Sequence, residues 1–127
     1  MGLGTFGADG ELFFEIQLVA VNGEEFFVSA LFDTGFTDGW LAINTQDLEA
    51  LQWSEVLGQV TMRTARGEAD FYIYKGKVVI DEIELVIPVH VGRDIPKTTM
   101  GSAWLDIMKL VVSKPQGILS LEIVEHG

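Results

Sequence analysis

The sequence of 127 residues contains no cysteine, few basic residues and no long apolar run. Without cysteine the chain has no disulfides, no thiolate metal ligands and no cysteine nucleophile. Lys and Arg number 8 against 19 Asp and Glu, which gives a formal net charge of −11. This charge excludes binding of nucleic acid by neutralising its phosphates, and it disfavours an anionic membrane surface.

Targeting and membrane-spanning segments are missing from the sequence as well. Residues 1–6 have neither the basic segment nor the apolar segment of a secretory signal. No run approaches the roughly 18 apolar residues that a membrane-spanning helix needs. We therefore expect a soluble cytoplasmic protein that binds neither nucleic acid nor a membrane.

The length and the apolar content suit a single domain. Hydrophobic residues make up 48% of the chain, and the mean hydropathy of +0.30 argues against disorder. Residues 1–10 are rich in glycine and lack the lysine of a phosphate-binding loop. We expect these ten residues to be a flexible N-terminal tail, followed by one domain over residues 11–127.

Alternation of apolar and polar residues predicts mostly strands. Four hairpins are expected, over residues 12–32, 59–74, 77–91 and 111–124, with turns at Asn22-Gly23, Ala65–Glu68, Asp81-Glu82 and Pro115–Gly117. A helix is predicted to begin after Asn44 or Thr45, and another to span Ser102–Leu110 with Ser102 as its cap. The expected fold is all-β, a small barrel or sandwich with one or two short helices.

The order of elements repeats once along the chain. The hairpin over residues 12–32 leads to Asp33-Thr34-Gly35 and then to a helix. The hairpin over residues 77–91 leads to Thr99-Met100-Gly101 and a second helix. Such a repeat indicates a duplication folded around a pseudo-two-fold axis, although a chance succession of hairpins produces the same order.

Asp33-Thr34-Gly35 is the segment that points to chemistry. It follows the apolar strand residues 30–32, so Asp33 lies where a strand leaves the core. Glycine at position 35 lets the backbone turn sharply and approach a ligand closely. Two such aspartates about 3 Å apart share one proton and act as base and acid on a water and an amide. The same three residue types also form ordinary turns.

Together with the hairpin at Ala65–Gly67 and the segment Met100–Leu105, this motif resembles the retropepsin-like aspartic proteases. The resemblance covers residues 12–124. It implies a small, closed, barrel-like acid-protease fold with a flap hairpin. It also implies an aspartic endopeptidase that cleaves a peptide or protein substrate and needs neither a metal nor an organic cofactor.

The resemblance assigns roles to the motif residues. Members are homodimers in which each subunit supplies one catalytic aspartate, here Asp33. Thr34 would connect the two active-site loops by hydrogen bonds between subunits, and the Gly35 carbonyl would accept a contact from the substrate backbone. A single Asp-Thr-Gly in this chain agrees with a dimer, because the second carboxylate must come from another copy.

The flap is expected around Ala65, Arg66 and Gly67, closing over an extended peptide. Arg66 is bulkier than the small residues that retroviral flaps carry. The C-terminal hairpin, residues 111–124, is longer than the family's terminal strand, so the dimer sheet is expected to differ.

Residues that follow the motif depart from the family pattern. Phe36 stands where a small residue is usual, and we expect its ring to narrow the substrate cleft or fill an inner pocket. Thr37 and Ser102 occupy the positions of an Asp and Arg that form an ion pair in the family. Asp38 is the residue expected to take over part of that polar contact with substrate.

The sequence contains two histidines, His90 and His126. His90 alternates with apolar residues of a predicted strand, which favours a structural histidine with satisfied hydrogen bonds, and His126 is interpreted as part of a solvated tail. Two histidines without cysteine predict no metal site.

Two alternatives to the protease remain: a non-catalytic peptide-binding or assembly module on the same fold, and an unrelated structural β domain.

Overall fold

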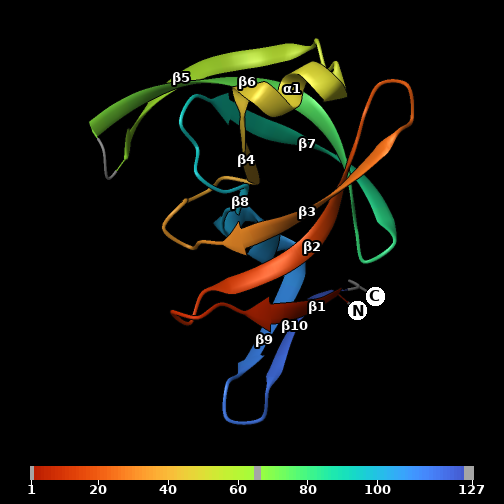
Figure 1. Cartoon of the computed structure of the whole chain (residues 1–127), viewed down its shortest axis with the longest axis vertical. Coiled ribbons are helices and arrows are strands. Elements are labelled where there is room, and N and C mark those ends of the chain that lie inside the picture. Colours follow the sequence, from red (N-terminus) through yellow and green to blue (C-terminus); the bar gives the residue numbers. More distant parts are fainter. Residues whose placement is uncertain (1, 65–66, 125–127) are drawn as a thin grey trace.

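The fold consists almost entirely of β-strands. The computed structural model describes residues 2–64 and 67–124 (Figure 1). Its strands are β1 (Gly2–Phe6), β2 (Leu12–Val19), β3 (Glu25–Phe32), β4 (Leu41–Asn44), β5 (Val56–Thr64), β6 (Gly67–Ile80), β7 (Ile83–Gly92), β8 (Thr99–Met100), β9 (Met108–Ser113) and β10 (Ile118–Ile123). The helices are α1 (Thr45–Leu51) and a short 3₁₀ helix, η1 (Ser102–Asp106). The prediction of an all-β fold with short helices is confirmed.

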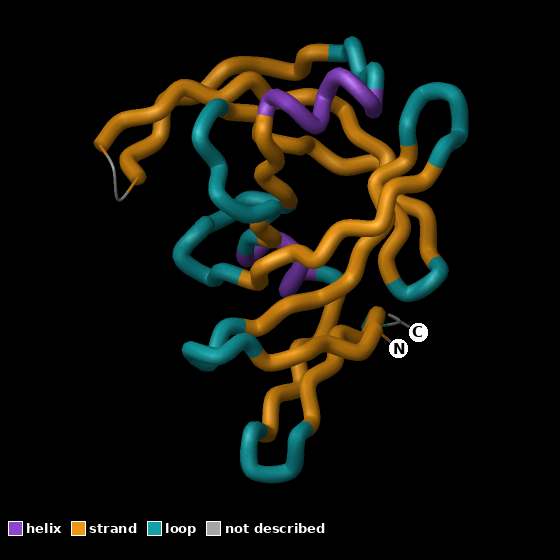
Figure 2. Tube along the Cα trace, viewed as in Figure 1, coloured by secondary structure: helices purple, strands orange, loops and turns teal. Residues whose placement is uncertain are grey.

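Six strands form a closed ring. Their order is β6, β7, β4, β8, β3 and β2, and pairing of β2 with β6 closes the barrel. The closing register places Leu18 opposite Val78, with one further pair on each side. Figure 2 shows α1 near one end of this barrel and the β9–β10 hairpin projecting from the other end. The predicted closed barrel is therefore confirmed.

Alternate residues of the strands fill the barrel with apolar side chains. Phe14, Ile16 and Leu18 of β2 are buried on one face, as their spacing predicts. They belong to one core cluster that also contains Trp104 from η1 and Leu121 from β10. Both of these side chains are 0% exposed, so the C-terminal segment is part of the same core.

The predicted hairpins form, and the turn residues adopt the backbone that each turn needs. Asp81 and Glu82 have φ of 52° and 63°, the left-handed values of a two-residue turn between β6 and β7. Gly23 has φ of 90° in the first hairpin. The loop there spans residues 20–24 and is wider than the two-residue turn expected from Asn22-Gly23.

The prediction of a flexible tail over residues 1–10 is wrong. Residues 2–6 form β1, which pairs with β10 on one side and with β2 on the other. Gly4 lies where a Cβ would come within 2.6 Å of the Leu119 side chain, so glycine here permits close packing. Gly4 therefore allows β1 to pack closely against β2 and the Leu119 side chain.

Helix α1 begins as the sequence predicts. The Asn44 side chain accepts a hydrogen bond from the Gln46 backbone N–H, which satisfies one free donor of the first turn. Among the described residues, no helix is long and apolar enough to cross a membrane.

The helix predicted over Ser102–Leu110 is shorter than expected and is not an α-helix. It is the 3₁₀ helix η1, and it ends at Asp106 because β9 begins at Met108 and pairs with β10. Ser102 is not its cap: Gly101 precedes the helix, and the Ser102 hydroxyl bonds to another loop. The backbone N–H and C=O groups of residues 108–110, which a longer helix would use, pair with β10 instead.

The strand pairings have the two-fold symmetry that the repeated order indicates. β3 runs parallel to β8, and β7 runs parallel to β4. The two short strands β4 and β8 are antiparallel to each other. Exchanging β3 with β7 and β4 with β8 reproduces the same pairings, so the loop after Asp33 corresponds to residues 93–98 and not to Thr99–Gly101 as the sequence repeat suggested. The Asp33 loop lies beside Gly101 because β3 pairs with β8.

The burial of Leu121 predicts that the terminal hairpin contributes to stability. We expect Leu121→Ala to lower the free energy of unfolding by about 2–5 kcal/mol, because it leaves a cavity in the core. Leu57→Ala is the matched control, since Leu57 is 53% exposed and its truncation should change stability by about 0.5 kcal/mol or less. Urea unfolding measures both. Equal effects of the two substitutions would contradict a core role for β10.

Candidate active site

Asp33 lies directly after β3, at the surface. Its backbone N–H donates to the Met100 carbonyl at 2.9 Å, which joins the end of β3 to β8. Its carboxylate Oδ1 accepts a hydrogen bond of 2.8 Å from the Gly35 N–H. The side chain is exposed, and this local bond holds its orientation while the other carboxylate oxygen remains available.

The loop after Asp33 is joined to the start of η1 by backbone hydrogen bonds. The Ser102 N–H donates to the Phe36 carbonyl at 3.0 Å, and the Ala103 N–H donates to the Gly39 carbonyl at 3.1 Å. A Cβ on Gly101 would overlap the Gly39 carbonyl oxygen and lie 2.6 Å from the Phe36 carbonyl oxygen. Glycine at position 101 is therefore required for this close approach.

A neutral hydrogen bond stands where the family pattern has an ion pair. The Ser102 hydroxyl accepts a hydrogen bond of 2.8 Å from the Asp38 backbone N–H, between residues 64 positions apart. Asp38 has φ of 60°, so this bond supports a left-handed backbone that only a few residue types adopt readily. Asp38 thus contacts Ser102 through its backbone N–H. The side chains of Thr37 and Asp38 are exposed, and neither residue lines the cleft described next.

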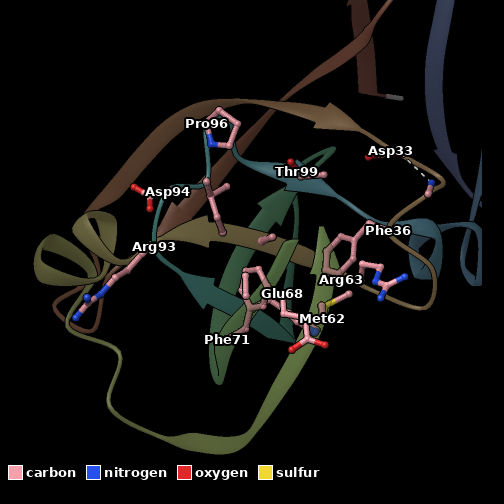
Figure 3. A pocket seen from close by; sticks show the side chains of 15 residues that line it. Asp33, Phe36, Met62, Arg63, Glu68, Phe71, Arg93, Asp94, Pro96 and Thr99 are labelled. Carbon is pink, nitrogen blue, oxygen red and sulfur yellow. Dashed lines mark hydrogen bonds between the residues drawn. The ribbon is translucent and has the colours of Figure 1, made fainter. Parts of the chain in front are cut away.

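Asp33 opens onto a cleft of about 520 Å³. Four parts of the chain line it: the active-site loop, the flap strands, β4 with β7, and the loop before β8. Figure 3 shows the labelled side chains around this space. The lining residues are Asp33, Gly35, Phe36, Ala42, Met62, Arg63, Glu68, Ala69, Phe71, His90, Arg93, Asp94, Ile95, Pro96 and Thr99.

The β5–β6 hairpin covers one side of the cleft, as expected of a flap. Met62 on β5 is paired with Ala69 on β6, and both line the cleft. The Thr61 hydroxyl donates to the Asp70 carboxylate at 2.6 Å, which connects the two flap strands. Gly67 has φ of 107°, the positive φ predicted for it. Ala65 and Arg66, predicted at the flap tip, lie outside the described residues, as does His126.

Phe36 lines the cleft wall. Its ring lies over Gly39, where a Cβ would overlap it, and packs edge-to-face on His90 with ring centroids 5.0 Å apart. The half-buried ring therefore forms part of one side of the cleft. Asp33 stays exposed at the opening of the cleft.

The interpretation of His90 as a satisfied structural histidine is wrong. Its Nδ1 is buried and has no hydrogen-bond partner among the described residues, and its ring lines the cleft. Burial lowers the pKa of His90, because it penalises the charged form. Alternation in β7 correctly placed His90 on the face opposite Val89 and Val91, but it did not reveal that this face borders a cleft.

The fold brings Asp33, Gly35 and Phe36 together at the cleft, whereas Thr34 is exposed on the loop. The Thr34 hydroxyl has no hydrogen-bond partner within the described part of its own chain. No motif in the sequence pointed to the other residues that line the cleft, which are Ala42, Met62, Arg63, Glu68, Ala69, Phe71, Arg93, Asp94, Ile95, Pro96 and Thr99. Within the described ranges, no three His, Asp or Glu side chains are grouped as metal ligands would be.

The fold is retropepsin-like, as its similarity to solved structures shows. A retropepsin-like aspartic protease from Rickettsia conorii matches with a TM-score of 0.66 and 24% sequence identity, over 94% of this chain and 95% of that one. EIAV protease complexed with the inhibitor HBY-793 matches with a TM-score of 0.62 and 16% identity, over 80% of this chain and 91% of that one. No protein-family model and no curated protein sequence matches the chain.

The close approach of Gly101 to the Phe36 and Gly39 backbone predicts that a side chain is not tolerated there, whereas one is tolerated at Gly58. Gly101→Ala should lower the free energy of unfolding by about 3 kcal/mol, because the new methyl group meets backbone atoms. Gly58→Ala is the matched control: a Cβ there has no atom within 4 Å, and the change should stay within about 1 kcal/mol. Thermal unfolding compares the two variants. A Gly101→Ala protein as stable as wild type would contradict the contact.

Proposed function

We propose that the protein is a homodimeric aspartic endopeptidase. The observation that supports this most directly is the position of Asp33, an exposed carboxylate at the opening of a 520 Å³ cleft under a flap hairpin. A cleft of this size beside an Asp-Thr-Gly loop, on a retropepsin-like fold, supports a binding site for an extended peptide. This combination favours hydrolysis of a peptide bond over a purely structural role.

The chemistry needs two carboxylates close together. Each chain supplies one at this loop, so the second is the Asp33 of another copy. Two carboxylates about 3 Å apart cannot both ionise, and the pair holds one proton. The ionised oxygen removes a proton from a water as that water attacks the scissile carbonyl carbon. The protonated oxygen then donates its proton to the departing amide nitrogen.

The proposed dimer places the two Asp33 loops against each other around a two-fold axis. Thr34 supports this arrangement, because its exposed hydroxyl is free of partners in the described part of its own chain and is available to a neighbouring subunit. Apolar side chains are exposed on the terminal strands and η1, which offers further surface to bury: Leu3, Leu105, Val112 and Ile118.

The proposed substrate is an extended peptide held between the flap and the active-site loop. An extended chain gains hydrogen bonds to strand edges and places alternate side chains in pockets. The flap strands and the Gly35 carbonyl are the backbone groups nearest to such a peptide. Half-buried and buried apolar residues of the cleft, Met62, Phe36 and Phe71 among them, would contact its side chains.

The central test compares wild type with Asp33→Asn on a mixed peptide library between pH 3 and pH 8, with products identified by mass spectrometry. The substitution keeps the shape of the side chain and removes the group that titrates. Wild type should cleave best in mildly to moderately acidic solution, where the pair carries one proton. Asp33→Asn should lose at least about a thousandfold in rate, since both base and acid depend on the pair.

Asp47→Asn provides the control for this test, because Asp47 is exposed on α1 and the change alters charge by the same amount. It should cleave like wild type. Cleavage that persists in Asp33→Asn, or a rate that rises steadily above neutral pH, would contradict the proposal. Peptide binding without cleavage by a folded dimer would instead support the non-catalytic peptide-binding module.

The dimer is tested by mixing chains. Wild type is unfolded and refolded with a ninefold excess of Asp33→Asn, so that the two chains pair at random. If each active site takes one Asp33 from each subunit, activity should fall about tenfold relative to wild type alone. Refolding with the same excess of Asp47→Asn should raise activity instead. Unchanged activity in the Asp33→Asn mixture would show that one chain suffices.

A further inference from the structure

Three rings form a continuous row along one wall of the cleft. His90 lies between Phe36, at 5.0 Å and 89°, and Phe71, at 6.0 Å and 64° between ring planes. All three residues line the cleft (Figure 3, which labels the two phenylalanines). We call this set, Phe36, His90 and Phe71, the ring row.

Two glycines leave room for the outer rings of the row. The Phe36 ring lies over Gly39, and the Phe71 ring lies over Gly92, where a Cβ would come within 2.6 Å of it. His90 sits on β7 opposite Ala42 of β4, whose small side chain also lines the cleft. The ring row is therefore a closely packed part of the cleft wall, with the polar residue His90 between the two phenylalanines.

The two nitrogens of His90 have different surroundings. Nδ1 is buried without a partner among the described residues. Buried N–H groups without partners are rare, which favours the tautomer in which Nδ1 is the bare acceptor and Nε2 carries the proton. Because the ring lines the cleft, Nε2–H is the group it offers to a ligand, and protonation of the ring in acid leaves this donor in place.

We infer that the ring row is a specificity subsite that selects a substrate side chain bearing a carbonyl oxygen, with His90 donating a hydrogen bond to it. This inference rests on the proposed function as a peptide-cleaving cleft. An apolar side chain over His90 would cover its N–H without replacing the hydrogen bond to water, which costs binding free energy. An amide oxygen restores that bond, and the flat amide fits against the rings on either side.

The charges around the cleft favour an amide over a carboxylate. Three carboxylates line it, on Asp33, Glu68 and Asp94, against the guanidinium groups of Arg63 and Arg93. The chain as a whole carries a net charge of −11. A further negative charge on the substrate would meet repulsion from both sources. The subsite is therefore assigned to asparagine or glutamine side chains.

The test measures binding and cleavage of matched peptides. A library peptide that binds or is cleaved is resynthesised with Met, Gln or Glu at each position in turn, since Met and Gln are nearly equal in size. Binding is measured on Asp33→Asn by fluorescence anisotropy, and kcat/KM on wild type. At one position, Gln should be favoured over Met by about tenfold and over Glu by a smaller factor.

Two variants connect this preference to His90. His90→Phe keeps a ring in the row and removes the donor, so the ratio of Gln to Met should fall to about one. His90→Gln restores an N–H donor and should recover part of the ratio. Thermal unfolding of both variants confirms that they fold. A preference for Gln that survives in folded His90→Phe would overturn the assignment.

The outcomes separate the subsite from the catalytic proposal. A Gln preference in binding without any cleavage by wild type would support the subsite and refute the protease. Cleavage with no position that favours Gln over Met would leave the protease in place and overturn the subsite, as would a stronger preference for Glu. Failure to bind any peptide would refute both.

Discussion

The junction between β3 and β8 is the constraint on which the rest of this structure depends. There the Asp33 N–H bonds to the Met100 carbonyl, and Gly101 passes so close to Gly39 that a single methyl group does not fit. Two segments about half the chain apart are thus packed together as one unit. The unit adjoins the β4–β8 pairing within the barrel, and it also holds the Asp33 carboxylate at the mouth of the cleft.

The flap depends on the same barrel, because one strand belongs to both. β6 runs without a break through residues 67–80: its first part pairs with β5 as the flap, and its last part pairs with β2 to close the barrel. Phe71 lies within the flap part, yet its ring packs over Gly92 of β7 and against His90. The position of the flap relative to the cleft wall is therefore set by core packing as well as by the hairpin.

Features that depend on residues near one another in sequence were predicted well. The hairpin between β6 and β7 and the start of α1 at Asn44 follow from local turn and capping chemistry. Features that depend on partners far away in the sequence were not predicted. Residues 2–6 were expected within a flexible tail, yet they form a strand that pairs with β2 and with the distant β10. The segment from Ser102 has a helical pattern, but pairing of β9 with β10 ends the helix early.

The sequence by itself determined the strand pattern, the Asp-Thr-Gly loop after β3 and the face of β7 on which His90 lies. Alternation in a strand is a local property, so it separates the two faces of that strand. Only the tertiary structure decided what covers each face. Folding placed Phe36 and Phe71 on either side of His90, left its Nδ1 without a partner in the described chain, and brought the Ser102 hydroxyl to the Asp38 backbone. These contacts join residues on different strands and loops, and no local pattern encodes which of those segments meet.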